Sequence, residues 1–312
     1  MAENFSASDA TGAAAATFPG GAALRRGSTG WVLVEDLPER ALGGALVWAA
    51  RSDLEELHVL TGSKDAAGVL ARRAGAFRRP PRVWLTHGRT VSPAVAASLP
   101  ALRQPAGADL AVAAMFAAAG AEAVVEHGVL VAEVLGLEVG RVVEGRLDVG
   151  VGKHDREAQR LVHGDRPPEE SLLAAVAAVR EVRRPDAPVH EMNRLAQERW
   201  LRSVVMANPT LVGAAFLAPL PDPVRREGLR RPAPAPSAGV DARGRPLVVV
   251  CSTGIDLDLV PTAADARLGH DPTARLIIVV PEADDHPVTR DLAAALVDPA
   301  EVVAMPGDWR RT

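Results

Sequence analysis

Three short segments carry the residue types with the clearest capacity for chemistry, and the first follows an apolar run near the C-terminus. The segment Cys251–Asp258 offers a thiol, two hydroxyls, a flexible glycine and two carboxylates. In an open parallel sheet, ligands bind beyond the carboxyl ends of the strands, where loops lead into helix N-termini. The candidate ligand-binding residues of this loop are Cys251, Ser252, Thr253 and Gly254. The structural alternative is that Asp258 caps the following helix and that Cys251 is a small buried residue.

The second segment, Thr61–Asp65, also lies between an expected strand and an expected helix. It contains Lys64, one of only two lysines in a chain that otherwise uses arginine, so this position could require a compact ammonium group. Glycine followed by serine and lysine at a helix start could bind phosphate or another anion through backbone N–H groups. The spacing is not that of a P-loop. The alternative is a capped helix with an exposed lysine.

The third segment, Asp148–Glu157, combines alternating glycines with a dense group of ionisable side chains. Lys153 is the second lysine of the chain, and His154 and Asp155 follow it directly. Together they could hold a phosphate or transfer a proton. The alternative is a solvated turn for which Asp155 serves as a helix cap.

Several carboxylates could instead form a metal site. Asp256 and Asp258 could together bind a divalent cation such as Mg²⁺, because carboxylate oxygens are the ligands that this ion prefers. The further candidate metal ligands are Glu138, Asp148 and Asp241. No pair of histidines or cysteines has the spacing of a structural zinc site.

The segment Gly239–Gly254 resembles the core of the restriction-endonuclease-like PD-(D/E)XK superfamily. In that core, a metal-binding aspartate precedes an apolar strand that ends in (D/E)-x-K and leads into a helix and another strand. Asp241 matches the aspartate, but Cys251 stands at the position of the acidic ligand and Thr253 at that of the lysine. The resemblance therefore implies a degenerate, binding-only relative unless other groups hold the metal and activate water. The groups that could do so are Glu138, Asp148 and Lys153.

These segments support three hypotheses of different classes. The first is a protein that binds a phosphorylated small molecule or a nucleic-acid backbone at Cys251–Asp258, with Lys153 in the same pocket. The second is a metal-dependent hydrolase that uses Asp256 and Asp258 with Glu138 or Asp148. The third is an interaction or scaffold protein that contacts its partner through a basic, proline-rich loop. The stretch 199–245 holds eight arginines against three acidic residues, which favours an acidic partner for such a loop.

The composition limits the class of protein. Hydrophobic residues make up 48% of the 312 residues and charged residues 24%, as in an ordinary globular protein. The net charge of −4 argues against a surface that is basic throughout. One cysteine cannot form an internal disulfide, and no leader or membrane-spanning run is recognisable, so the sequence predicts a cytoplasmic protein.

The elements that must position these residues predict an α/β fold. Residues 1–28 show no periodicity and are expected to be a disordered tail. An N-terminal α/β lobe follows over residues 29–105, and its βαβαβ order implies a parallel sheet. Its strands are expected at 31–35, 57–61 and 82–86.

The remainder, residues 106–312, is expected to form a second α/β domain with a helical and hairpin middle region. Helices are predicted at 109–119 and 122–135, followed by a hairpin of 137–143 with 146–151 that turns at Glu144-Gly145. A helical region over 155–206 contains helices from residue 167 and from residue 191. The prolines of 218–245 predict an irregular loop. A C-terminal βαβαβ unit completes the chain, with strands at 246–251, 276–280 and 302–305 and helices at 259–268 and 288–297.

Overall fold

The computed structural model describes residues 12–152, 155–157, 166–184, 186–188, 190–222 and 233–311. It confirms an α/β protein with three sheets. The chain divides into two compact units. The first contains Met1–Leu99, Ile255–Asp265 and His286–Val302, and the second contains Pro100–Gly254, Ala266–Asp285 and Val303–Thr312. Within the described residues, no helix is both long enough and apolar enough to cross a membrane.

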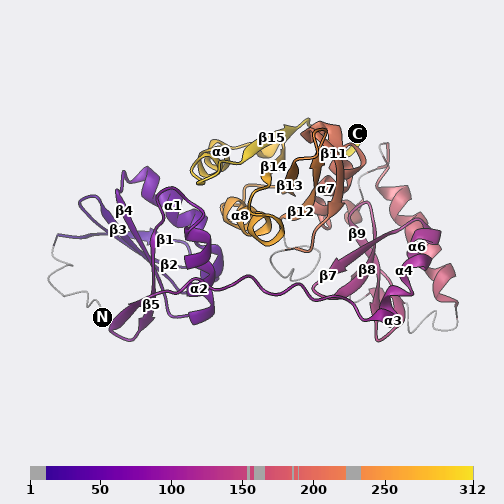
Figure 1. Cartoon of the computed structure of the whole chain (residues 1–312), viewed down its shortest axis with the longest axis horizontal. Helices are drawn as coiled ribbons and strands as arrows, with labels where there is room; N and C mark the ends of the chain where they lie inside the picture. The colour runs from indigo at the N-terminus through magenta and orange to yellow at the C-terminus, as the bar shows by residue number, and fades with distance from the viewer. Residues whose placement is uncertain are drawn as a thin grey trace. The chain divides into compact units, whose positions relative to one another are not determined.

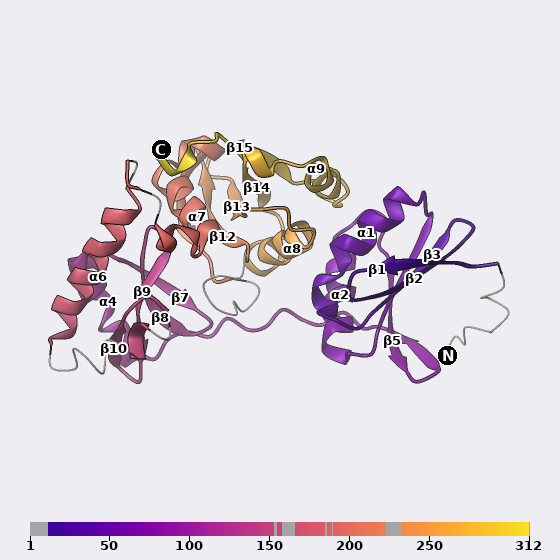
Figure 2. The same ribbon diagram turned by 180° about the vertical axis from the view of Figure 1, so that it is seen from behind.

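The N-terminal lobe is a six-stranded sheet in the order β1-β2-β3-β4-β5-β6. Strands β3, β4 and β5 are parallel, as the βαβαβ pattern predicts. Helices α1 and α2 lie on one side of this sheet (Figures 1 and 2). The strand bounds are β1 (Ala14–Phe18), β2 (Gly21–Arg26), β3 (Thr29–Val34), β4 (Glu56–Thr61), β5 (Arg82–His87) and β6 (Thr90–Pro93), and the helix bounds are η2 (Pro38–Arg40), α1 (Leu42–Arg51) and α2 (Lys64–Ala74).

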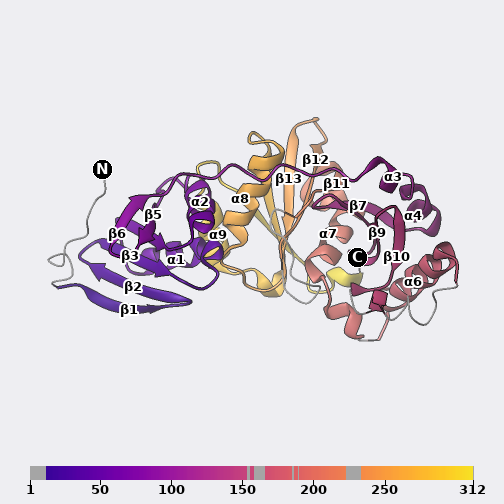
Figure 3. The ribbon, with the colours of Figure 1, turned by 90° about the horizontal axis from the view of Figure 1, so that it is seen from below.

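The prediction of a disordered tail over residues 1–28 is wrong for its second half. Strands β1 and β2 form an antiparallel hairpin, and β2 pairs with β3 (Figure 3). Of the five residues of β1, only Phe18 is buried, and the others are small and exposed. Because backbone pairing rather than an apolar face holds this strand, the sequence shows no alternation there.

The second unit contains a four-stranded antiparallel sheet in the order β10-β9-β8-β7. Helices α4 and α6 lie on one side of it (Figure 2). Phe116 of α4, Leu172 of α6 and Leu137 of β9 belong to its core. The bounds of these elements are α3 (Gly107–Leu110), α4 (Ala113–Ala119), β7 (Glu122–Glu126), β8 (Val129–Val134), β9 (Leu137–Val143), β10 (Arg146–Val149), α6 (Pro168–Val182) and η3 (Glu191–Arg194).

The helix predicted over 122–135 is wrong, because this stretch forms β7 and β8. The predicted hairpin of β9 and β10 is confirmed. All three turns of this sheet place a residue and a following glycine at positive φ, as tight hairpin turns require. The three pairs are His127-Gly128, Leu135-Gly136 and Glu144-Gly145. The regular spacing of these pairs indicates successive hairpins more strongly than the alanine content of the stretch indicates a helix.

The C-terminal lobe is a five-stranded sheet in the order β11-β12-β13-β14-β15, with β13 and β14 parallel. The predicted βαβαβ order is confirmed. Within 218–245, β12 and the end of β11 replace part of the expected irregular loop, and residues 223–232 lie outside the described residues. The bounds are α7 (Gln197–Ala207), η4 (Pro209–Val212), β11 (Ala214–Pro219), β12 (Ala235–Asp241), β13 (Pro246–Cys251), α8 (Leu259–His270), β14 (Arg275–Pro281), η5 (Glu282–Asp284), α9 (Pro287–Ala294), β15 (Glu301–Met305) and η6 (Trp309–Arg311).

The two lobes repeat one topology. In each, an antiparallel run of three strands leads through a helix to a parallel fourth strand and through a second helix to a fifth. The segments after the two second helices pair with each other at Phe77 and Leu296. This pairing is reciprocal, because residue 78 donates to the carbonyl of residue 295 at 3.0 Å and residue 297 donates to that of residue 76 at 2.9 Å.

Candidate functional site

The turn between β4 and α2 combines hydroxyls, a glycine and a lysine at the carboxyl edge of the N-terminal sheet. The side chain of Ser63 caps α2 by accepting a hydrogen bond from the N–H of Ala66 at 3.3 Å. The hydroxyl of Thr61 accepts from the N–H of Ser63 at 3.2 Å, which fixes the turn. Lys64 is the first residue of the helix and is exposed. The helix therefore presents its positive N-terminal end and a lysine ammonium at the same edge.

The neighbouring strand β5 adds polar groups that the sequence hypotheses did not use. A Cβ built on Gly62 would lie 3.6 Å from the Oγ1 of Thr86, so the turn after β4 lies beside the end of β5. His87 follows Thr86 and is exposed. The sequence could have indicated Thr86 and His87 as site residues, because they end a strand that is predicted to lie next to β4 in the sheet.

The loop after β13 has acidic neighbours. The hydroxyl of Thr253 donates to the Oε1 of Glu198 at 3.2 Å, and the N–H of Gly254 donates to the Oδ2 of Asp284 at 2.7 Å. Carboxylates therefore occupy the donors that a phosphate would use, which disfavours an anion at Thr253 and Gly254.

Cys251 and Ser252 are buried in the same lobe. Cys251 belongs to the core that α7 forms with the sheet, and the N–H of Ser252 donates to the carbonyl of Val279 at 3.0 Å. Burial raises the pKa of the Cys251 thiol to about 12, so the thiol is protonated at neutral pH. This placement agrees with the structural alternative for Cys251.

Asp256 and Asp258, which belong to the first unit, are both engaged by arginines. The Nη2 of Arg40 lies 3.0 Å from the Oδ2 of Asp256, and the Nη1 of Arg73 lies 2.8 Å from the Oδ2 of Asp258. Burial raises the pKa of the Asp258 carboxyl to about 6, against the opposing effect of Arg73. Asp258, which directly precedes α8, also accepts from the hydroxyl of Thr262 in that helix. The arrangement fits ion pairing better than cation binding.

The other proposed metal ligands have separate surroundings. Glu138 is buried and bonded to Arg141 at 2.7 Å and to Arg156 at 2.8 Å. Asp148 lies on β10 and is half-buried. Asp241 accepts from the N–H groups that follow it in the β12–β13 turn, at the opposite end of that hairpin from Cys251. Within the described ranges, no group of three or more histidine, cysteine, aspartate or glutamate side chains could hold a metal ion.

The structure describes only part of the cluster of Lys153, His154 and Asp155, because Lys153 and His154 lie outside the described residues. Asp155 is exposed, and its Oδ2 accepts from the N–H of Val151 at 2.6 Å, so it closes the turn after β10. The hypothesis that this cluster shares a pocket with the Cys251 loop stays a prediction.

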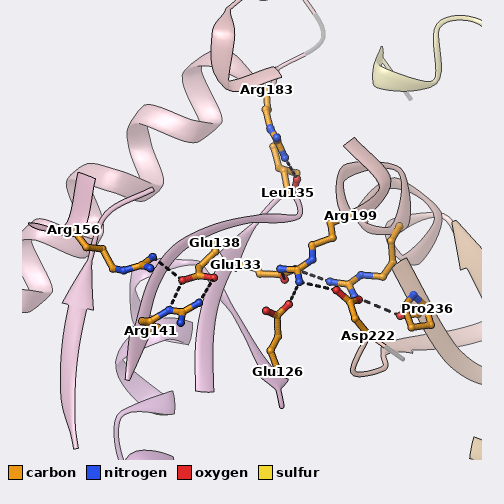
Figure 4. A network of polar contacts seen from close by, with 11 residues as sticks. Glu126, Glu133, Leu135, Glu138, Arg141, Arg156, Arg183, Arg199, Asp222 and Pro236 are labelled. Carbon is orange, nitrogen blue, oxygen red and sulfur yellow. Dashed lines mark hydrogen bonds and ion pairs between the residues drawn. The ribbon is translucent and has the colours of Figure 1, made fainter. Parts of the chain in front are cut away.

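A buried network of charges fills the space between β7, β8 and α7 (Figure 4). Arg199, only 1% exposed, bonds Glu133 and Asp222 at 2.9 Å each and also pairs with Glu126. Arg202 bonds the second carboxylate oxygen of Glu133 at 2.6 Å. Two of the eight arginines in the basic stretch 199–245 are therefore internal ion-pair partners. They are not available to a nucleic-acid backbone.

Glu126 is a carboxyl of this network with a raised pKa. Burial raises its pKa to about 7, and the negative charges of Asp222, Glu133 and Glu138 act in the same direction. The attraction of Arg199 opposes this shift, but that guanidinium is shared with two other carboxylates. Burial and the neighbouring carboxylates therefore outweigh the ion pair.

Replacing Glu126 with glutamine should change how stability depends on pH. The folded wild-type protein keeps the Glu126 proton up to about pH 7, whereas the unfolded chain loses it near pH 4.5. The proton on Glu126 therefore stabilises the folded protein fully below about pH 4.5. This stabilisation, on the order of 2–3 kcal/mol, is lost as the pH rises through 7. In urea denaturation, Glu126→Gln should be more stable than wild type at pH 8 and nearly equal at pH 5. A constant difference between pH 5 and pH 8 would contradict the assignment.

No protein-family model, curated protein or solved structure matches this chain.

Proposed function

We propose that the protein binds a phosphate-bearing ligand at the carboxyl edge of the N-terminal sheet, at the turn Thr61–Lys64. The observation that carries this proposal is the start of α2, where the Ser63 cap orders the helix end and the exposed Lys64 is the first helical residue. The first N–H groups of a helix have no partner within it, and the helix dipole favours negative charge there. Phosphate is the common biological anion that such an end accommodates.

The charges at the two strand-end turns favour this position. The loop after β13 engages Glu198 and Asp284, which would repel a phosphate. The edge of the N-terminal lobe carries Lys64 and, after the adjacent strand, His87, together with the exposed Asp65 in the first turn of α2. The phosphate-bearing ligand that the sequence analysis placed at Cys251–Asp258 therefore fits the Lys64 turn better than that loop.

The phosphate could belong to a small metabolite or to a nucleic-acid backbone, and binding measurements distinguish the two. Inorganic pyrophosphate and a nucleotide panel test the first source. A fluorescent single-stranded RNA of mixed sequence tests the second, with titrations at several salt concentrations. Backbone binding should fall linearly with the logarithm of salt concentration, by a slope of about 0.7 for each phosphate contact.

Lys64→Ala should weaken binding of the tightest probe by about tenfold, since a charge-assisted hydrogen bond contributes about 1.5 kcal/mol. Lys64→Arg should retain most of the affinity. Arg51→Ala removes another exposed cation, at the end of α1, and serves as the matched control with unchanged affinity. Isothermal titration calorimetry or fluorescence anisotropy measures these differences. Equal losses in Lys64→Ala and Arg51→Ala, or no binding of any probe, would overturn the proposal.

A further inference from the structure

Strand β1 is the outer edge of the N-terminal sheet, because among the described strands it pairs only with β2 (Figure 3). A strand at the edge of a sheet presents a row of backbone N–H and C=O groups with which a further strand can pair. Four of the five residues of β1 are exposed, and they are three alanines and one threonine. These small side chains leave the backbone of the edge accessible.

The other sheet edges that the structure describes carry features that discourage such pairing. Charged side chains, prolines and bulges are the usual means by which proteins protect an edge. Strands β7, β10 and β15 contain charged residues, β6 contains a proline, and β11 contains a proline and a shift in its pairing register. Strand β1 has neither a charged residue nor a proline, and its register with β2 is regular. Among the edge strands of the described residues, β1 alone lacks these features.

The end of this edge at Ala14 is basic. Arg25 of β2 pairs with Ala14 in the register, so its side chain lies on the same face as that small residue. Arg25 is exposed, as is Arg26, which ends β2. Glu55 accepts from the hydroxyl of Ser28 at 3.2 Å, between β2 and β3 and thus on the side of β2 away from β1. The arginines of β2 therefore stand between this carboxylate and the β1 edge.

The other end of the edge, at the turn after β1, is acidic. Glu35 and Asp36 follow β3, and both donate their N–H groups to the carbonyl of Gly20 in this turn, at 2.9 and 3.0 Å. Both acidic residues are exposed. Arg40, the next cation along the chain, pairs with Asp256 at 3.0 Å. Guanidinium groups therefore adjoin one end of β1 and carboxylates the other.

From these observations we infer that β1 pairs antiparallel with β1 of a second copy of the chain, so that the two N-terminal sheets become one. Antiparallel pairing of a strand with its own copy brings the basic end of each copy to the acidic end of the other. Parallel pairing would bring like charges together. The alanines of the two edges can meet without steric conflict.

The assembly closes as a dimer. The same strand of both copies forms the contact, and β6, the opposite edge of the sheet, contains Pro93 and resists pairing. Because the contact is one pair of short strands, the dimer lies at the low-affinity end of protein association. This contact shares no residue with the Lys64 turn, so the two proposals succeed or fail independently.

Sedimentation velocity of the full chain over a wide range of concentrations tests the contact. Wild-type protein should shift from monomer to dimer as the concentration rises and form no larger species. Ala15→Lys/Thr17→Lys places two charges on each edge strand and should raise the dimer dissociation constant about tenfold or more. The matched control is Ala22→Lys/Leu24→Lys, because these exposed residues of the interior strand β2 pair directly with the other two. The control should leave the dissociation constant nearly unchanged.

Charge reversal at the two ends identifies the partner and its orientation. Arg25→Glu/Arg26→Glu makes both ends acidic, and Glu35→Arg/Asp36→Arg makes both ends basic. Each variant alone should associate about tenfold more weakly than wild type, because every dimer contains the contact between ends twice. An equimolar mixture of the two variants should restore dimers, since opposite charges then meet at both ends.

Circular dichroism confirms that the variants fold, and Thr17→Lys alone replaces the edge variant if the double substitution prevents folding. Monomers at every concentration of wild-type protein would overturn the inference. Equal dissociation constants for the lysine variants of β1 and β2 would also overturn it. A mixture of the charge-reversed variants that associates no more tightly than either variant alone would exclude antiparallel pairing of β1 with its own copy.

Discussion

Replacing Arg199 with methionine is expected to lower the free energy of unfolding by about 3–5 kcal/mol. Arg199 bonds Glu126, Glu133 and Asp222, and it is 1% exposed. Its removal leaves Glu133 with Arg202 but takes an ion-pair partner from Glu126. An uncompensated buried carboxylate costs far more than the pair itself contributes.

Arg194→Met is the matched control for Arg199→Met. Arg194 pairs with Glu191, and both side chains are at least 70% exposed, so the loss should stay below about 1 kcal/mol. Urea denaturation at pH 8 measures both variants. Should Arg199→Met fail to fold, Arg199→Lys keeps the charge without the two-pronged geometry and should fall between wild type and methionine. Equal stability of Arg199→Met and Arg194→Met would show that the network contributes little.

Replacing Gly136 with alanine should cost about 3 kcal/mol or more, the second largest effect expected. Gly136 has a φ of 76° in the turn between β8 and β9. A Cβ at this position would lie 2.2 Å from the carbonyl carbon of Arg199 and 2.4 Å from the backbone N of Trp200. Backbone atoms cannot yield as a flexible side chain can, so the turn would have to move away from α7.

Gly213→Ala separates the steric effect at Gly136 from backbone strain. Gly213 has a similar φ of 68°, but no atom lies within 4 Å of its added Cβ. Its alanine variant should therefore lose only about 1–2 kcal/mol, the cost of a left-handed alanine. Thermal and urea denaturation of the two variants give the difference. A loss at Gly136 no greater than at Gly213 would show that the turn does not pack closely against α7.

The sequence was most informative where burial on both faces leaves a continuous apolar run. Strands β13 and β14 follow the predicted bounds closely, because nearly every residue in them is buried. The sequence failed over 122–135, where alanine and valine together suit a helix or a strand. The turns His127-Gly128 and Leu135-Gly136 decide for strands, since a helix has no place for two successive residues at positive φ.

The sequence by itself determined the α/β class, the parallel βαβαβ orders and the Ser63 cap that precedes Lys64, because these depend on local spacing. Only the tertiary structure decided which charges are internal. Arg199 and Arg202 looked like part of a basic surface, yet they lie opposite Glu133, more than sixty positions away. It likewise showed that Phe216 faces outward, because its direction depends on a register shift against β12. Pairing between distant segments sets both features, and the spacing of neighbouring residues does not encode it.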